Sequence, residues 1–127
     1  MSIKYELRKL ARDRGQENER RFIAALTSNN DCMLPLWLRS VRCATKDEDH
    51  HGIDAVLETD VGKIFFQVKS SQRGAEKHRR RRRRIHTIVM VVRVGMSDEN
   101  IRKYALAEAQ TYREKLLAER TYLSEKP

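Results

Sequence analysis

Two strand-like segments joined by a short turn place the strongest constraint on the fold of this chain. Residues 53–59 (IDAVLET) and residues 63–70 (KIFFQVKS) are rich in β-branched and aromatic side chains. The three residues between them, at positions 60–62, are Asp-Val-Gly and supply a tight turn. The sequence therefore predicts an antiparallel β-hairpin over residues 53–70.

The register of this hairpin decides which polar side chains meet. Gln67 and Lys69 are two residues apart, so both project from the face of their strand that Phe65 shares. If the numbers of paired residues sum to 121 or 123, Asp54 lies opposite Gln67 or Lys69, with β-carbons about 4.5–5.5 Å apart. If the sum is even, Asp54 faces the other side. The residues expected to face the core are Ile64, Phe66 and Val68.

A helix and a strand are predicted before the hairpin. Apolar residues at helical spacing predict a helix over residues 2–28 that is broken or bent at Gly15 and ended by residues 29–31. Residues 36–44 (LWLRSVRCA) are expected to form the first strand. Residues 45–52 (TKDEDHHG) are expected to form a polar loop, solvated rather than metal-binding.

A strand and a helix are also predicted after the hairpin. A polar, basic connection over residues 71–84 leads to residues 85–94 (IHTIVMVVRV), which are the most apolar stretch and are expected to lie centrally in the sheet. Ser97 is expected to cap a final helix that runs to about residue 120. Tyr104 and Tyr112 follow helical spacing and are expected in the core.

The size and cysteine content favour one intracellular domain. A chain of 127 residues can bury a real core, so we expect a single domain over residues 1–127. The sequence has no apolar signal region and no apolar run of membrane-spanning length. Cys32 and Cys43 match neither a disulfide framework nor a common zinc pattern. The expected location is the cytoplasm, with no membrane partner.

Positive charge is concentrated in one segment. The formal net charge is +9, and removing the six consecutive arginines at 79–84 lowers it to +3. Adjacent like charges repel, so this run forms either a solvated face or an arm that binds phosphate, and we favour the second. Ser70 and Ser71 are candidates for phosphate contact or for a strand-ending turn. The candidate nucleic-acid-binding residues are Ser70, Ser71, Lys77, Arg79, Arg80, Arg81, Arg82, Arg83 and Arg84.

Glu19 is a carboxylate on the apolar face of the first predicted helix. It precedes Phe22 by three positions, Ile23 by four and Leu26 by seven, which places all four side chains on one face. A buried carboxylate is costly unless a charged group meets it, and an arginine, solvent at a helix end or a metal ion would each serve. Similarly, Asp54 beside a lysine is consistent with a simple salt bridge.

These residues together resemble the PD-(D/E)xK nuclease superfamily. The segment GQENER at 15–20 is similar to the G-x-x-x-E-R pattern in the first helix of archaeal Holliday-junction resolvases. GID at 52–54 followed by QVK at 67–69 is similar to Mrr-type restriction endonucleases, in which glutamine commonly replaces the acidic residue. The likeness spans roughly residues 14–94. It implies a restriction-endonuclease-like αβββαβ core, an α/β fold with a central mixed sheet flanked by helices.

The resemblance implies a role for each matching residue. Asp54 matches the metal-binding aspartate, and Gln67 and the Val68 backbone carbonyl match further metal ligands. Lys69 matches the lysine that positions or activates the attacking water. Glu19 matches the first-helix acid that completes or supports the metal site. The implied protein is a Mg²⁺- or Mn²⁺-dependent endodeoxyribonuclease that hydrolyses DNA phosphodiester bonds, branched DNA among its candidate substrates, and that forms a homodimer.

Two departures from the family pattern leave other functions open. Ile53 stands where the family motif has proline, a common replacement. Gln67 removes one negative charge, so a catalytically inactive nucleic-acid-binding module of the same fold is an alternative. A third reading is a basic interaction protein in which Asp54 and Lys69 form a salt bridge.

Overall fold

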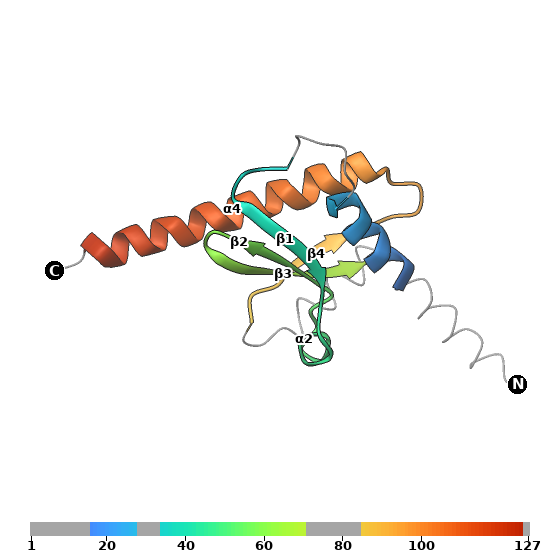
Figure 1. The fold of residues 1–127 in the computed structure, drawn as a ribbon, viewed down its shortest axis with the longest axis horizontal. Helices are drawn as coiled ribbons and strands as arrows, with labels where there is room; N and C mark the ends of the chain where they lie inside the picture. The colour runs from blue at the N-terminus through green and yellow to red at the C-terminus, as the bar shows by residue number, and fades with distance from the viewer. Residues whose placement is uncertain (1–15, 28–33, 71–84, 126–127) are drawn as a thin grey trace, which may run out of the picture.

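The computed structural model describes residues 16–27, 34–70 and 85–125 of the chain. Within these ranges the protein is α/β, with a four-stranded mixed sheet and three helices (Figure 1). The predicted α/β class is confirmed at this level. In chain order the elements are a helix over residues 16–27, β1 (Leu38–Cys43), α2 (Lys46–His50), β2 (Ala55–Thr59), β3 (Gly62–Lys69), β4 (Ile88–Val91) and α4 (Asp98–Glu125).

Several sequence-based expectations fall outside the described ranges. They include the helical segment 2–15 with its break at Gly15, the helix end at 29–31 and Cys32. They also include most of the basic connection, with the candidate nucleic-acid-binding residues Ser71, Lys77, Arg79, Arg80, Arg81, Arg82, Arg83 and Arg84.

The predicted β2–β3 hairpin is confirmed, and its register is one of the odd ones that the sequence left open. Thr59 pairs with Gly62 and Ala55 pairs with Phe66, so paired residue numbers sum to 121. The turn holds two residues rather than three, because Gly62 already belongs to β3 and adopts a positive φ of 112°. The Thr59 hydroxyl fastens the turn by accepting a hydrogen bond from the Val61 N–H at 3.2 Å.

The expectation of a central position for the segment 85–94 is wrong. The strand order is β1-β2-β3-β4, with β1 antiparallel to β2 and β4 parallel to β3, so β4 lies at the edge of the described sheet. Its burial alternates: Ile88 and Met90 are buried, whereas Val89 and Val91 are only partly covered. The segment is apolar because one face of β4 is buried and the other face is partly buried. It is not apolar because β4 lies between two other strands.

Two helices cover one face of the sheet and close the core. The 16–27 helix lays Phe22 against Phe66 of β3, with ring centroids 5.1 Å apart. Ile101 and Ala105 of α4 join the same buried cluster (Figure 1). The Arg21 guanidinium donates to the carbonyl oxygens of Arg93, at 3.1 Å, and Met96 in the segment before α4. These contacts fix the 16–27 helix, and with it Glu19, relative to the strands.

The last helix begins as predicted but extends further. The Asn100 N–H donates to the Ser97 hydroxyl at 3.1 Å, which confirms Ser97 as the cap, and α4 continues to Glu125. Tyr112 is partly buried and stacks on His86, with centroids 4.2 Å apart. Tyr104 is 52% exposed, contrary to expectation, because it lies one position, or about 100° of helix rotation, before the buried Ala105.

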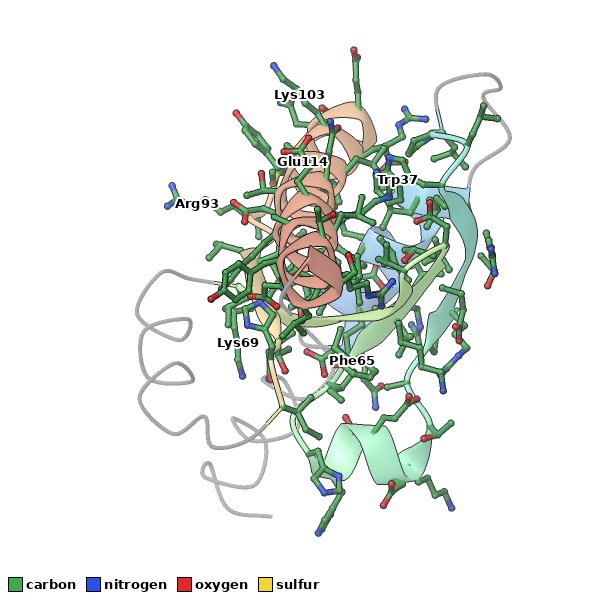
Figure 2. All side chains as sticks on the ribbon, turned by 90° about the vertical axis from the view of Figure 1, so that its left-hand side faces the viewer. Trp37, Phe65, Lys69, Arg93, Lys103 and Glu114 are labelled. Atoms are coloured by element: carbon green, nitrogen blue, oxygen red, sulfur yellow. The ribbon has the colours of Figure 1, made fainter. Side chains whose placement is uncertain are left out.

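The hairpin turn anchors the middle of α4. Arg113 donates two hydrogen bonds to the Asp60 carboxylate, at 2.8 and 2.7 Å. Its guanidinium also lies 5.8 Å from the ring centroid of Trp37, which is seen beside α4 in Figure 2.

None of the helices in the described ranges combines the length and the apolar character that crossing a membrane requires.

The segment predicted as a polar loop contains a short helix, α2. Thr45 and Glu48 form a capping box, in which the Glu48 N–H donates to the Thr45 hydroxyl and the Thr45 N–H donates to the Glu48 carboxylate. The T-x-x-E signature of this box is present in the sequence at Thr45–Glu48. The helix matters because it forms one wall of the candidate site.

Candidate functional site

Asp54 lies where β2 separates from β3. Its N–H donates to the Phe66 carbonyl at 2.8 Å, although Phe66 pairs with Ala55, so two consecutive residues face one residue of β3 and the regular ladder is interrupted here. Its carboxylate Oδ2 accepts a hydrogen bond from the Val68 N–H, also at 2.8 Å. The Asp54 side chain therefore occupies the place of the backbone carbonyl that would otherwise accept from the Val68 N–H. The paired register ends at Ala55 and Phe66, so it does not itself set Asp54 opposite Gln67 or Lys69; the hydrogen bond from Val68 is what places the Asp54 carboxylate at this end of β3.

The Val68 carbonyl points to the same strand edge as the Asp54 carboxylate. In a strand, the N–H and C=O of one residue point to the same side. The Val68 N–H points towards Asp54, while the Lys69 carbonyl points the other way and accepts from Val92 of the β4 side at 2.8 Å. The predicted backbone ligand therefore lies at the separation of β2 and β3.

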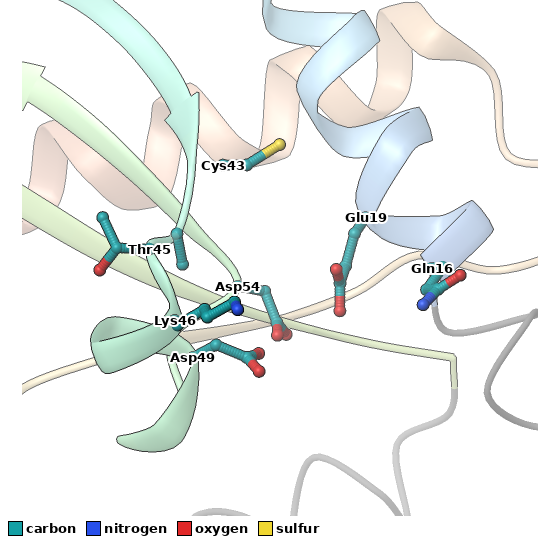
Figure 3. A pocket seen from close by; sticks show the side chains of 8 residues that line it. Gln16, Glu19, Cys43, Thr45, Lys46, Asp49 and Asp54 are labelled. Atoms are coloured by element: carbon teal, nitrogen blue, oxygen red, sulfur yellow. The ribbon is translucent and has the colours of Figure 1, made fainter.

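Glu19 meets Asp54 from the opposing helix, and the two carboxyl groups approach each other in the pocket that both line (Figure 3). Burial, followed by the charge of Asp54, raises the pKa of Glu19 from 4.5 to about 7. Burial also raises the pKa of Asp54, although the hydrogen bond from Val68 opposes that shift. The pair therefore holds a proton near neutral pH unless a positive charge joins it.

Lys69 supplies part of that positive charge. It is partly buried near the end of β3, and its charge lowers the pKa of both Glu19 and Asp54 (Figure 2). Gln67 projects from the same face of β3 and is 8% exposed. Glu19, Asp54 and Lys69, predicted to converge, are thus within electrostatic reach of one another. Gln67 directly precedes Val68, whose N–H binds the Asp54 carboxylate.

The sequence analysis missed Asp49 as a member of this group. Asp49 lies on α2 and its negative charge raises the pKa of both Glu19 and Asp54. It was assigned to a solvated loop. The capping box, one turn earlier in the sequence, would have revealed a helix able to project this carboxylate in a fixed direction.

An open pocket of about 570 Å³ lies between the 16–27 helix and α2. Three carboxylates line it, from Glu19, Asp49 and Asp54, and Lys46 lies on the α2 wall (Figure 3). The exposed free thiol of Cys43 also borders the pocket. Ser70, at the end of β3, is exposed and is not part of the pocket lining.

Arg42 clamps α2 to the sheet. From β1 it donates hydrogen bonds of 2.6 and 2.9 Å to the two oxygens of Glu48, and one of 3.2 Å to Glu58 on β2. Hydrogen bonding from Arg42 is the main reason why the pKa of Glu48 falls to about 2. The clamp holds the pocket wall that carries Asp49 at a fixed distance from Asp54.

We expect Arg42→Gln to lower the free energy of unfolding by about 1–2 kcal/mol, because it removes charge-assisted hydrogen bonds that are partly exposed to solvent. Urea unfolding followed by circular dichroism measures the change. Arg39→Gln is the matched control, since Arg39 is an exposed arginine on the same strand outside the clamp. Equal losses in the two variants would contradict the role given to Arg42.

The donor set around Asp54 fits a cation that keeps much of its water. Within residues 16–27, 34–70 and 85–125, no three His, Cys, Asp or Glu side chains are grouped closely enough to hold a metal ion by themselves. Two carboxylates with raised pKa values, a neighbouring amide and a backbone carbonyl remain. Mg²⁺ is commonly bound by one or two carboxylates with several waters, so these residues suit it better than a metal that needs a full protein cage.

Fold and site together define an α/β protein with a carboxylate-lined pocket where two strands separate. Comparison of the chain with protein-family models, with curated proteins and with solved structures gives no match. The function therefore has to be argued from the site.

Proposed function

We propose that this protein is a metal-dependent endonuclease that hydrolyses DNA phosphodiester bonds at the Glu19–Asp54 pair. The observation that carries the proposal is that the Glu19 and Asp54 carboxyl groups meet in one pocket (Figure 3), where burial raises the pKa of both and the charge of Asp54 raises that of Glu19 further. Such a pair is unfavourable when ionised and becomes favourable when a divalent cation sits between its oxygens. The likeness of GID and QVK to PD-(D/E)xK nucleases supports the same assignment.

Each side chain has a distinct task in this proposal. The Val68 N–H holds Asp54 Oδ2, which leaves Oδ1 to bind the cation together with Glu19, the Gln67 amide oxygen and the Val68 carbonyl. Bound Mg²⁺ or Mn²⁺ would polarise the phosphoryl oxygen and lower the pKa of a water molecule. The Lys69 ammonium orients that water and stabilises the negative charge that grows on the phosphate.

A cleavage panel tests the proposal directly. Four-way junction, flap, duplex and single-stranded DNA would each be incubated with Mg²⁺ or Mn²⁺, and products followed on denaturing gels. The wild-type protein is expected to cut at least one substrate, and EDTA or Asp54→Ala to stop the cutting. Cutting that persists in both Asp54→Ala and Lys69→Ala preparations would come from another site or another protein, and the proposal would fail.

The second candidate function is a nucleic-acid-binding module without catalysis. Two observations favour it: Gln67 replaces an acidic ligand, and no three acidic, histidine or cysteine side chains in the described part of the chain form a metal cluster. In this reading the Glu19–Asp54 pair keeps its proton at neutral pH and binds no metal, and the basic residues alone contact the nucleic acid.

Gln67→Glu separates the two functions. A carboxylate next to Val68, whose N–H binds Asp54, adds a ligand charge, so we expect Mn²⁺ to bind on the order of tenfold more tightly than to wild type, measured by calorimetry. Gln16→Glu, which adds the same charge at an exposed position on the pocket rim, controls for a general electrostatic effect. Tighter Mn²⁺ binding combined with cutting that appears only in Gln67→Glu would favour the inactive module for the natural chain. Equal affinities in the two variants would remove Gln67 from the ligand set.

A further inference from the structure

Lys46 holds a place in the pocket that the proposed reaction does not use. It is the first residue of α2, its side chain is exposed, and it lines the same pocket as Asp49 and Asp54 (Figure 3). Among residues 16–27, 34–70 and 85–125 its ammonium has no ion-pair partner. The Lys46 ammonium lines a pocket with three carboxylates and forms an ion pair with none of them, so it is available to bind a ligand.

The clamp on α2 explains why Lys46 faces the pocket. Lys46 and Asp49 are three residues apart, so they share one side of the helix. Glu48 is turned to the sheet and held there by Arg42. The rotation of α2 about its axis is therefore fixed, and Lys46 is kept over the pocket opening.

The ammonium of Lys46 is the group on this wall that remains free to bind an anion. The Thr45 hydroxyl already accepts the Glu48 N–H, so that amide of the first turn is engaged within the capping box. Carboxylates line the remaining pocket and repel an anion that approaches them directly. A ligand with several phosphates can satisfy both features, with one phosphate at the cation between Glu19 and Asp54 and another at Lys46.

We propose that Lys46 binds a backbone phosphate of the nucleic-acid strand, next to the phosphate that is placed at the Glu19–Asp54 pair. This inference rests on the proposed function for the position of the strand. Binding by a lysine of this kind is independent of sequence, adds affinity and weakens as salt rises. The competing explanation is that Lys46 only offsets the negative charge of Asp49 and Asp54 and touches no ligand.

Lys46→Gln tests the proposal, with Lys63→Gln as the matched control. Lys63 is an exposed lysine near the hairpin turn, at the opposite end of β3 from Lys69 and the pocket. Fluorescence anisotropy would measure binding of labelled duplex and single-stranded DNA over a range of KCl concentrations, both in EDTA and with Ca²⁺ as the divalent cation. We expect Lys46→Gln to weaken binding about three- to tenfold and to reduce the salt slope by about one, and Lys63→Gln to change neither.

Calorimetric titration with Mn²⁺ completes the test. Lys46→Gln should bind Mn²⁺ as tightly as wild type or more tightly, because a positive charge near the carboxylates has been removed. Unchanged DNA affinity in Lys46→Gln, or an equal loss in Lys63→Gln, would overturn the proposal, and so would a wild-type protein that binds neither DNA. These measurements follow binding and not cutting, so they decide on Lys46 even if the protein proves unable to cut DNA, and the EDTA series shows how much of the effect is independent of a cation.

Discussion

Asp54→Asn is expected to abolish metal-dependent DNA cutting and, at the same time, to make the protein more stable in EDTA. The rate should fall at least about a thousandfold, because the variant loses the charged oxygen that holds the cation and the reactive water. The stability should rise because the charge removed is half-buried and faces Glu19. The asparagine side-chain oxygen can still accept the hydrogen bond from the Val68 N–H.

Single-turnover cutting assays and thermal unfolding, in EDTA and in Mn²⁺, measure both halves of this expectation. Asp47→Asn is the control, since Asp47 is an exposed aspartate on α2 outside the pocket lining. Mn²⁺ should raise the melting temperature of wild type and of Asp47→Asn but not of Asp54→Asn. A less stable Asp54→Asn protein would mean that Asp54 has a structural role, and its loss of activity would then say nothing about catalysis.

Stability without metal is expected to fall as pH rises from about 5 to about 8. The pKa of Glu19 is raised in the folded protein, from 4.5 to about 7, so its protonated form is the one that suits the fold. The stability linked to that proton is complete below about pH 4.5 and is lost as the pH rises through about 7. Because Glu19 is only partly buried, we expect a loss on the order of 2 kcal/mol. Asp54, whose pKa is also raised, adds a loss of the same sign.

Urea unfolding in EDTA at several pH values follows this loss. Glu19→Gln should flatten the pH dependence and be more stable than wild type at pH 8 in EDTA. Glu17→Gln serves as the control, because Glu17 is an exposed glutamate two positions away that forms an ion pair with Arg20 at 3.6 Å. At pH 8, Mn²⁺ at a hundredfold excess over its dissociation constant should raise the free energy of unfolding of the wild-type protein by about 2.7 kcal/mol. This gain would offset the loss caused by the rise in pH. If the stability of Glu19→Gln depended on pH as steeply as that of wild type, the raised pKa assigned to Glu19 would be wrong.

The core of the candidate site was predictable because it depends on local geometry. The hairpin could be predicted from its turn and its two strand-like segments, and the observed register is one of the odd registers that the sequence left open. The spacing of Glu19 from Phe22 likewise fixes its place on the helix, and Phe22 packs on Phe66. Periods of two in a strand and 3.6 in a helix are enough for both inferences.

The errors came from features that depend on what packs against a segment. The segment 85–94 reads as a central strand, yet β4 lies at the sheet edge, because an apolar run does not reveal which neighbour will cover it. Tyr104 follows helical spacing but lies just off the stripe that meets the core. Asp49 was overlooked because the polar composition of α2 outweighed its capping box.

The sequence by itself determined the hairpin and the place of Glu19 on the apolar face of its helix, since both depend on local backbone geometry, but it left the hairpin register open. Only the tertiary structure decided that Glu19 meets Asp54 closely enough to share a proton, and that Arg42 turns Asp49 and Lys46 towards them. Electrostatic coupling depends on distances between separate elements, and packing sets those distances.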